Sequence, residues 1–242
     1  MAITHLLLDI EGTTCPVSFV AEVLFPFARQ RLECFLAEHA DDPDLASLVN
    51  AVRMRWQADR SAEARALADA GESVVPYLHW LIDQDIKDTA LKDLQGRIWR
   101  EGYGSGVLVA PLFEDVPGAL QRWQAQGLVL AVYSSGSVPA QQLLYGHTQA
   151  GDLTPLFSHW FDTRTGAKQD PGSYRAICGA MGCTATQVLF ISDARAELEA
   201  AAGAGLAVLF SDREGNPSRD GGPFEKISDY STLGIGHGTH GP

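Results

Sequence analysis

Two carboxylates stand two residues apart directly after the first apolar run of the sequence. Asp9 and Glu11 follow the run at residues 3–8, and Gly12 lets the chain turn behind them. Carboxylates at the end of a buried strand are costly unless they bind a cation or transfer protons. We therefore interpret Asp9 as a candidate nucleophile and metal ligand and Glu11 as a candidate proton-transfer acid. In the alternative interpretation Asp9 caps a helix and Glu11 is solvated.

Hydroxyl groups follow a second apolar run, which ends at Tyr133. Ser134 and Ser135 stand between this run and a helical pattern. Hydroxyls and free backbone N–H groups at a helix N-terminus bind anions, and phosphate is the usual one. The two serines are therefore candidate phosphate ligands, although serines at such a place are also common as simple helix N-caps.

Charged side chains of two further segments complete the set. Lys168, in an expected loop, can present a compact positive charge to a phosphate, although most loop lysines are merely solvated. Asp193 follows the apolar run at residues 188–191, and Glu197 lies one helical turn later on the same face. Carboxylate oxygens suit Mg²⁺, which takes further ligands from water and substrate phosphate. Alternatively, Asp193 is an N-cap followed by first-turn acids that favour the helix dipole.

The pattern of apolar runs predicts a scaffold that gathers these residues. Runs without polar alternation indicate buried parallel strands at residues 3–8, 128–133, 188–191 and 207–210. Helical patterns lie at residues 116–126, 139–146 and 194–202. Alternating strands and helices predict an α/β fold with a parallel sheet, in which ligands bind at the carboxyl ends of the strands.

The stretch from residue 17 to residue 108 has a different character. It shows no convincing strand, and amphipathic helical runs lie at residues 28–40, 45–70 and 77–100. We therefore predict a helical domain at residues 17–108, inserted after the first strand of a catalytic core that consists of residues 1–16 and 109–242.

Composition limits the classes of partner. The 242 residues include 18 basic and 30 acidic side chains, a net charge of −12, without a basic patch for nucleic acid or an anionic membrane. No apolar run approaches the ~20 residues that span a bilayer, and the N-terminus lacks the basic region of a secretory signal. The four cysteines have no metal-ligand spacing and are interpreted as free thiols. We expect a cytoplasmic protein with a small-molecule substrate.

The four segments, taken together, resemble the motifs of the haloacid dehalogenase superfamily. In chain order the resembling residues are Asp9-Ile10-Glu11-Gly12-Thr13, Ser134, Lys168, and Ser192-Asp193 with Glu197. Glu11 stands where the commonest form of the first motif has a second aspartate. The resemblance implies a Rossmann-like parallel sheet, and the helical insertion looks like the cap domain of that superfamily.

Within the superfamily, the sequence resembles the bifunctional enolase-phosphatases (acireductone synthases) of methionine salvage. The resembling stretches, which fall between about residues 3 and 210, include residues 9–14, 113–117, 133–137, 146–148 and 161–168. The resemblance implies enolisation of 2,3-diketo-5-methylthiopentyl 1-phosphate and its dephosphorylation through an aspartyl-phosphate. The products are 1,2-dihydroxy-3-keto-5-methylthiopentene (acireductone) and phosphate.

The same resemblance implies roles for individual residues. One Mg²⁺ per subunit would be held by Asp9, Asp193 and the backbone carbonyl of Glu11. Ser134, Ser135 and Lys168 would bind the phosphate, with Lys168 also acting in catalysis, and Glu197 would orient the site. The chain would act as a monomer. One alternative is a phosphatase of this superfamily that acts on another small phosphorylated metabolite. A second is a metal-free dehalogenase, which Glu11 and Asp193 argue against. A third is a catalytically silent module that binds phosphate.

Overall fold

The computed structural model describes residues 2–68, 71, 73–84, 86 and 88–235. The chain divides into two compact units, one formed by Met1–Val20 with Val109–Pro242 and the other by Ala21–Leu108. The second unit thus begins at residue 21, where the sequence pattern placed the start of the insertion at residue 17. Its action as a cap stays a prediction.

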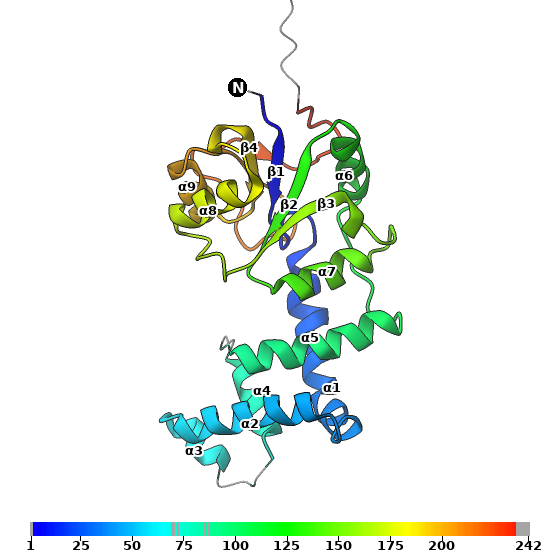
Figure 1. Ribbon diagram of the computed structural model, residues 1–242, viewed down its shortest axis with the longest axis vertical. Helices are drawn as coiled ribbons and strands as arrows, with labels where there is room; N and C mark the ends of the chain where they lie inside the picture. Colours follow the sequence, from blue (N-terminus) through cyan, green and yellow to red (C-terminus); the bar gives the residue numbers. More distant parts are fainter. Residues whose placement is uncertain (1, 69–70, 72, 85, 87, 236–242) are drawn as a thin grey trace, which may run out of the picture. The chain divides into compact units, whose positions relative to one another are not determined.

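A six-stranded parallel sheet in the order β3-β2-β1-β4-β5-β6 forms the centre of the first unit (Figure 1). The strands are β1 (His5–Leu8), β2 (Val129–Tyr133), β3 (Phe157–Phe161), β4 (Val188–Ser192), β5 (Ala207–Ser211) and β6 (Lys226–Ile227). The predicted α/β fold with a parallel sheet is therefore confirmed. The sequence pattern missed β3 and β6, because β3 carries Ser158 and His159 at the sheet edge and β6 is only two residues long.

Helices cover both faces of this sheet. They are α6 (Asp115–Ala125), α7 (Val138–Gly146), α8 (Pro171–Met181) and α9 (Arg195–Gly203), with short 3₁₀ turns at Thr154–Leu156 and Ala185–Gln187. In Figure 1, α8 and α9 lie on one side of the sheet and α6 on the other. Leu7, Ile177 and Leu198 belong to one buried cluster, which packs β1 against α8 and α9. All but α8 were predicted from the sequence, with bounds that differ by a residue or two.

The second unit consists of helices in the residues that the structure describes. A π-helix, η1 (Phe19–Leu24), leads into α1 (Phe25–Glu38), α2 (Pro43–Ala58), α3 (Ala62–Ala68), α4 (Val75–Asp83) and α5 (Thr89–Gly104). Fully buried Leu32, Val52, Tyr77 and Leu94 lie in its core. This core explains the apolar stripes of the three predicted helical runs.

Two of those runs are each divided into two helices. Between α2 and α3, Asp59 accepts a hydrogen bond from the Ser61 N–H, and Ser61 accepts one from the Ala64 N–H. Before α5, the Asp88 carboxylate accepts a bond from the N–H of Leu91 at 2.8 Å. Asp and Ser side chains supply partners for the free N–H groups of a new helix. These side chains therefore start a second helix within a stretch that the spacing of apolar residues alone predicts as a single helix.

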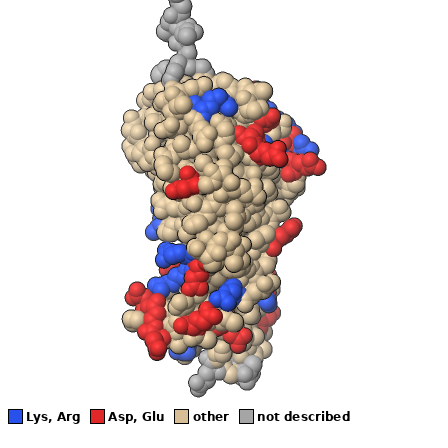
Figure 2. All heavy atoms as spheres, turned by 90° about the vertical axis from the view of Figure 1, so that its right-hand side faces the viewer, with Lys and Arg blue, Asp and Glu red and all other residues tan. Residues whose placement is uncertain are grey.

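The surface agrees with the charge balance of the sequence. Figure 2 shows one face, on which Lys and Arg side chains are scattered among Asp and Glu side chains without a continuous basic surface. In the described part of the chain, each helix is too short or too polar to cross a bilayer. All four cysteines are free thiols. The expected absence of nucleic-acid and membrane partners stays a prediction.

The cap of α5 gives a stability prediction. Asp88 is buried, and its carboxylate also pairs with Arg55 at 3.2 Å. Replacing Asp88 by Ala leaves the Leu91 N–H without its partner, so the free energy of unfolding should fall by about 1–2 kcal/mol. Urea denaturation followed by circular dichroism measures this loss. The exposed Asp93 of α5 is the control: Asp93→Ala should stay within about 0.5 kcal/mol of wild type, and equal losses in both variants would contradict the cap.

Candidate active site

Parallel register brings three strand ends to one edge of the sheet. Leu8, the last residue of β1, lies opposite Val132 of β2 and Ile191 of β4. The residues that follow these positions therefore emerge side by side. Asp9 is the residue after β1, and the segments that carry the predicted serines and Asp193 leave β2 and β4 at the same edge.

All site residues predicted from the sequence line one pocket of about 490 Å³ at this edge. They are Asp9, Glu11, Ser134, Ser135, Lys168, Asp193 and Glu197. The pocket is also lined by residues that the sequence did not single out, namely Val17, Ala194, Arg195, Pro217 and Ser218. Segments that are far apart in the sequence thus converge on one space, as the order of the motifs predicted.

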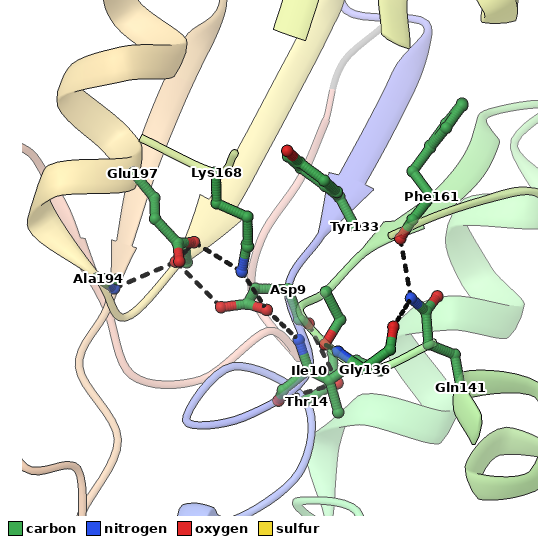
Figure 3. A network of polar contacts seen from close by, with 12 residues as sticks. Asp9, Ile10, Thr14, Tyr133, Gly136, Gln141, Phe161, Lys168, Ala194 and Glu197 are labelled. Carbon is green, nitrogen blue, oxygen red and sulfur yellow. Dashed lines mark hydrogen bonds and ion pairs between the residues drawn. The ribbon is translucent and has the colours of Figure 1, made fainter. Parts of the chain in front are cut away.

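Lys168 lies between two carboxylates at the centre of the site (Figure 3). Its Nζ atom is 2.7 Å from Oδ1 of Asp9 and 2.7 Å from Oε2 of Glu197. Asp9 is only 5% exposed, and its Oδ1 also accepts a bond from the Ile10 N–H at 2.8 Å. The lysine is therefore a buried ion-pair partner, and the interpretation of it as a solvated loop residue is wrong.

Ser192 joins the same two carboxylates from the other side. Its Oγ lies 3.2 Å from Oδ2 of Asp9 and 2.9 Å from Oε2 of Glu197, and it accepts a bond from the Ala194 N–H at 3.1 Å. Because a hydroxyl has one proton, Ser192 donates to one carboxylate at a time. Asp9, Lys168, Glu197 and Ser192 thus form a closed ring. Ser192 belongs to the segment that resembles a superfamily motif, but its local sequence does not indicate what its hydroxyl contacts.

The loop that carries Lys168 is fixed from α8. The Tyr174 hydroxyl donates to the Lys168 carbonyl at 2.7 Å, and the Ser173 hydroxyl donates to the Ala167 carbonyl at 2.8 Å. The ammonium also lies 5.7 Å from the centre of the Tyr133 ring, within the range of a cation–π contact. Helix α8, which was not predicted from the sequence, therefore positions Lys168, which was.

The charges in the pocket perturb one another. Burial lowers the pKa of Lys168, but the Asp9 and Glu197 carboxylates outweigh it and raise this pKa above its ordinary value. Burial and then the charge of Asp9 raise the pKa of Glu197 to about 7 and that of Asp193 to about 7. A single ammonium thus leaves negative charge uncompensated in the pocket. Such a group of carboxylates favours an additional cation.

Gly12 allows the turn behind Asp9 to pack against Asp193. Its φ of +66° lies in the left-handed region, which favours glycine. A Cβ atom at this position would lie 2.2 Å from Oδ2 of Asp193. The predicted turn is confirmed, and the close approach adds a second reason for glycine that the sequence did not reveal.

The serine loop and the start of α9 settle two of the alternative interpretations. The N-cap position of α7 is Ser137, so Ser134 and Ser135 are not its N-caps. The N-cap position of α9 is Ala194, so Asp193 does not cap that helix. The Ser134 side chain, which is buried, instead accepts a bond from the Gly136 N–H at 3.3 Å.

Gln141 holds this loop in place, and sequence reasoning missed it. Its Nε2 donates to the carbonyls of Gly136 and Phe161, each at 2.8 Å (Figure 3). One side chain on α7 therefore ties the serine loop after β2 to the end of β3. Nothing in the local sequence marks a glutamine in mid-helix as such a tie.

The carboxylate pair Asp9 and Asp193 fits a hard divalent cation. Both are oxygen donors, and burial followed by the charge of Asp9 raises the pKa of Asp193, a cost that a bound cation would offset. We looked among the described residues for three His, Cys, Asp or Glu side chains whose ligand atoms all lie within 4.8 Å of one another. One such group is present, and it consists of Glu38, His39 and Glu101 in the second unit. Asp9, Glu11 and Asp193 do not form such a group. A role for Glu11 as a metal ligand thus depends on its backbone carbonyl.

Comparisons with known proteins agree with the geometry. The model of the haloacid dehalogenase-like hydrolase family matches residues 3–205. An enolase-phosphatase E1 of Synechococcus elongatus is 51% identical and covers 96% of this chain and 98% of its own, and one of Prochlorococcus marinus is 49% identical with the same coverage. The crystal structure of the UTR4 protein of Saccharomyces cerevisiae is 34% identical, covers 96% of this chain and all of its own, and has a TM-score of 0.79.

The crowding of carboxylates predicts how stability depends on pH. The pKa of Asp193 is about 7 in the folded chain against an ordinary 3.8, so between these values the folded state binds a proton that the unfolded state has lost. Asp193 therefore lowers the stability of the metal-free protein as pH rises through this range. Asp193→Asn removes the charge and should raise the melting temperature at pH 8 by a few degrees, roughly 2–6 °C.

Thermal melts in the presence of a chelator measure this effect. The difference between Asp193→Asn and wild type should shrink toward zero near pH 4, where both side chains are neutral. The exposed Asp93 is again the control, because Asp93→Asn should melt like wild type at both pH values. A variant at Asp193 that melts at or below the wild-type temperature at pH 8 would show that this carboxylate is not under electrostatic strain.

Proposed function

The chain belongs to the enolase-phosphatase E1 family of the haloacid dehalogenase-like hydrolases, and on this premise we propose how its pocket carries out the reaction. The substrate is 2,3-diketo-5-methylthiopentyl 1-phosphate, an intermediate of methionine salvage. The enzyme enolises it and then removes the phosphate, which gives 1,2-dihydroxy-3-keto-5-methylthiopentene and inorganic phosphate. The location of the enzyme in the cytoplasm and its action as a monomer belong to the same proposal.

The position of the Asp9 carboxylate carries the phosphatase part of the proposal. This carboxylate is buried at the edge of the sheet and lines the pocket. The Lys168 ammonium and the Ile10 N–H hold its Oδ1 atom, and the Ser192 hydroxyl faces its Oδ2 atom. A carboxylate held in one orientation loses little entropy when it attacks phosphorus. An enzyme that transfers a phosphoryl group through an aspartate requires such a residue.

Dephosphorylation proceeds in two displacements on phosphorus. In the first, an oxygen of Asp9 bonds to phosphorus as the bond to the substrate oxygen breaks, and Glu11 gives that oxygen a proton. In the second, Glu11 takes a proton from water, the water oxygen bonds to phosphorus, and the bond to Asp9 breaks. Asp9 and Glu11 return to their initial protonation states, and phosphate leaves.

The other residues of the pocket stabilise charge during these steps. Ser134, Ser135 and the backbone N–H groups that follow Ser134 bind phosphate oxygens. Lys168 compensates the charge shared by Asp9 and the transferred group, and Glu197 keeps the ammonium in place through its 2.7 Å ion pair. Because Lys168 is held at both carboxylates before substrate arrives, little reorganisation is needed.

Mg²⁺ is the proposed metal, with one ion per subunit. The carboxylates of Asp9 and Asp193 and the backbone carbonyl of Glu11 would hold it. When bound, the ion supplies positive charge to the phosphate oxygens and to the oxygen that develops negative charge in enolisation. Because Glu11 would bind the ion through its backbone carbonyl, its side-chain carboxyl group stays available for proton transfer.

Enolisation precedes phosphate release in this scheme. A proton leaves a carbon next to a carbonyl, and the carbonyl oxygen gains one, so the step needs no oxidant or reductant. The step needs a base near that carbon and an electrophile for the developing oxyanion, roles that a carboxylate of the pocket and the bound cation would fill. An enol and phosphate are then the two observable products.

A single assay tests the proposed function. The protein is incubated with Mg²⁺ and the diketo phosphate while enol absorbance in the ultraviolet and free phosphate are recorded together. We expect the enol to form before phosphate and a chelator to stop both. Phosphate without an enol would favour a phosphatase for another small phosphorylated metabolite, and the absence of phosphate would contradict the proposal.

Replacement of the nucleophile is the matched test of the covalent route. Asp9→Asn should lower phosphate release by roughly 10³-fold or more, because an amide does not attack phosphorus, while the circular dichroism of the fold stays unchanged. Asp93→Asn, an exposed change of the same kind, should keep wild-type turnover. Near-normal turnover by the Asp9 variant would rule out an aspartyl-phosphate.

A further inference from the structure

The last residue of β5 and the segment that follows it contact the turn behind the nucleophile, although both lie beyond residues 3–205 that the family model matches. The side chains of Ser211 and Asn216 both donate to the carbonyl oxygen of Gly12, at 2.9 Å and 3.0 Å. The Tyr230 hydroxyl donates to the next carbonyl, that of Thr13, at 3.1 Å. Three side chains from the C-terminal part of the first unit therefore hold two consecutive peptide groups of the catalytic turn.

These contacts complete the restraint on Gly12. Its N–H donates to the Cys15 carbonyl at 2.8 Å, which fixes the peptide group shared with Glu11. The peptide group that it shares with Thr13 is held by the Thr13 N–H, which donates to the Ile10 carbonyl at 3.1 Å, and by the Ser211 and Asn216 side chains at its carbonyl oxygen. Glycine has the widest conformational freedom of all residues, so both of its peptide groups must be held if the preceding residue is to keep its orientation.

Asn216 lies at the point where this turn meets Asp193. A Cβ atom on Gly12 would lie 2.8 Å from Oδ1 of Asn216 and 2.2 Å from Oδ2 of Asp193. The amide of Asn216 and the carboxylate of Asp193 therefore pack against the same side of Gly12. The next two residues along the chain, Pro217 and Ser218, line the pocket itself.

Asn216 is held rigidly enough to act as a support. Its Nδ2 also donates to the Ser211 carbonyl at 3.2 Å, and its N–H donates to the Arg213 carbonyl at 3.3 Å. The Arg213 guanidinium, in a residue only 5% exposed, pairs with both carboxylate oxygens of Asp115 at 2.9 Å and 2.8 Å and lies over the Tyr230 ring. A buried bidentate pair of this kind fixes the start of the loop.

We propose that Asn216 is a positioning residue for the reaction. Its amide holds the Gly12 peptide so that Glu11 keeps its carboxyl group directed to the reacting oxygen and its carbonyl directed to the cation. The inference rests on the proposed function, because the role of Glu11 comes from it. It assigns a catalytic contribution to a segment that carries none of the motifs.

The test compares Asn216 with Asn50, the only other asparagine of the sequence, which is exposed on α2. Removal of a partner that orients a metal ligand costs roughly ten-fold or more in affinity or activity. Asn216→Ala should therefore lower kcat by about ten-fold with a KM for the diketo phosphate within about two-fold, and weaken Mg²⁺ binding in calorimetry by about ten-fold. Asn50→Ala should match wild type in all three.

Hydrogen exchange separates positioning from a general structural role. In the metal-free protein, Asn216→Ala should speed amide exchange in residues 10–15, measured by mass spectrometry, with the rest of the sheet unchanged and a melting temperature within about 4 °C of wild type. Asn216→Asp, which keeps the shape but replaces the donor by a carboxylate oxygen, should lose at least as much activity.

Each outcome decides the inference. A wild-type kcat together with wild-type Mg²⁺ affinity in either Asn216 variant would overturn the positioning role. A loss of activity with faster exchange throughout the first unit would also overturn it, because that result indicates a structural role alone. If the wild-type protein does not turn over the diketo phosphate, the proposed function fails. Calorimetry with Mg²⁺ and exchange in residues 10–15 still decide whether Asn216 positions the turn.

Discussion

One ammonium group surrounded by carboxylates dominates the electrostatics of the pocket. Lys168 bonds to Asp9 and Glu197 at 2.7 Å each, while Asp193 and Glu11 line the same pocket. Burial raises the pKa values of Asp193 and Glu197, and repulsion by the Asp9 carboxylate raises them further. In the proposed mechanism the same charged groups would hold a cation, transfer protons and attack phosphorus, which accounts for their being gathered in one pocket.

The fold supplies the rigidity that this arrangement needs. β1 lies between β2 and β4, and its residues Leu6, Leu7 and Leu8 are fully buried. Register fixes where each strand ends, so the acids meet without a dedicated binding loop. Side chains that carry no charge then fix the orientations: Ser192 joins the two carboxylates, Gln141 holds the serine loop, and Ser211 and Asn216 hold Gly12. The sheet thus brings the charged side chains close together, and these hydrogen bonds orient them.

The sequence predicted the elements and residues that leave a local signal. Buried parallel strands read as continuous apolar runs, and acids that follow them are conspicuous. The edge strand β3 was missed because Ser158 and His159 interrupt its apolar run. Asn216 and Gln141 could not be found, because their roles consist of hydrogen bonds to residues far away in the sequence. Polar side chains of this kind occur in any loop or helix, and only the fold shows what they contact.

Detection of the covalent intermediate is the most direct test of the central claim that these segments converge on a reactive Asp9. The protein with Mg²⁺ is mixed with the diketo phosphate, quenched in acid within a turnover, digested and examined by mass spectrometry. We expect a phosphoryl group on the peptide that contains Asp9, absent after Asp9→Asn and after a complete turnover. Turnover at the full rate with a phosphoryl group on another residue, or on none, would contradict it.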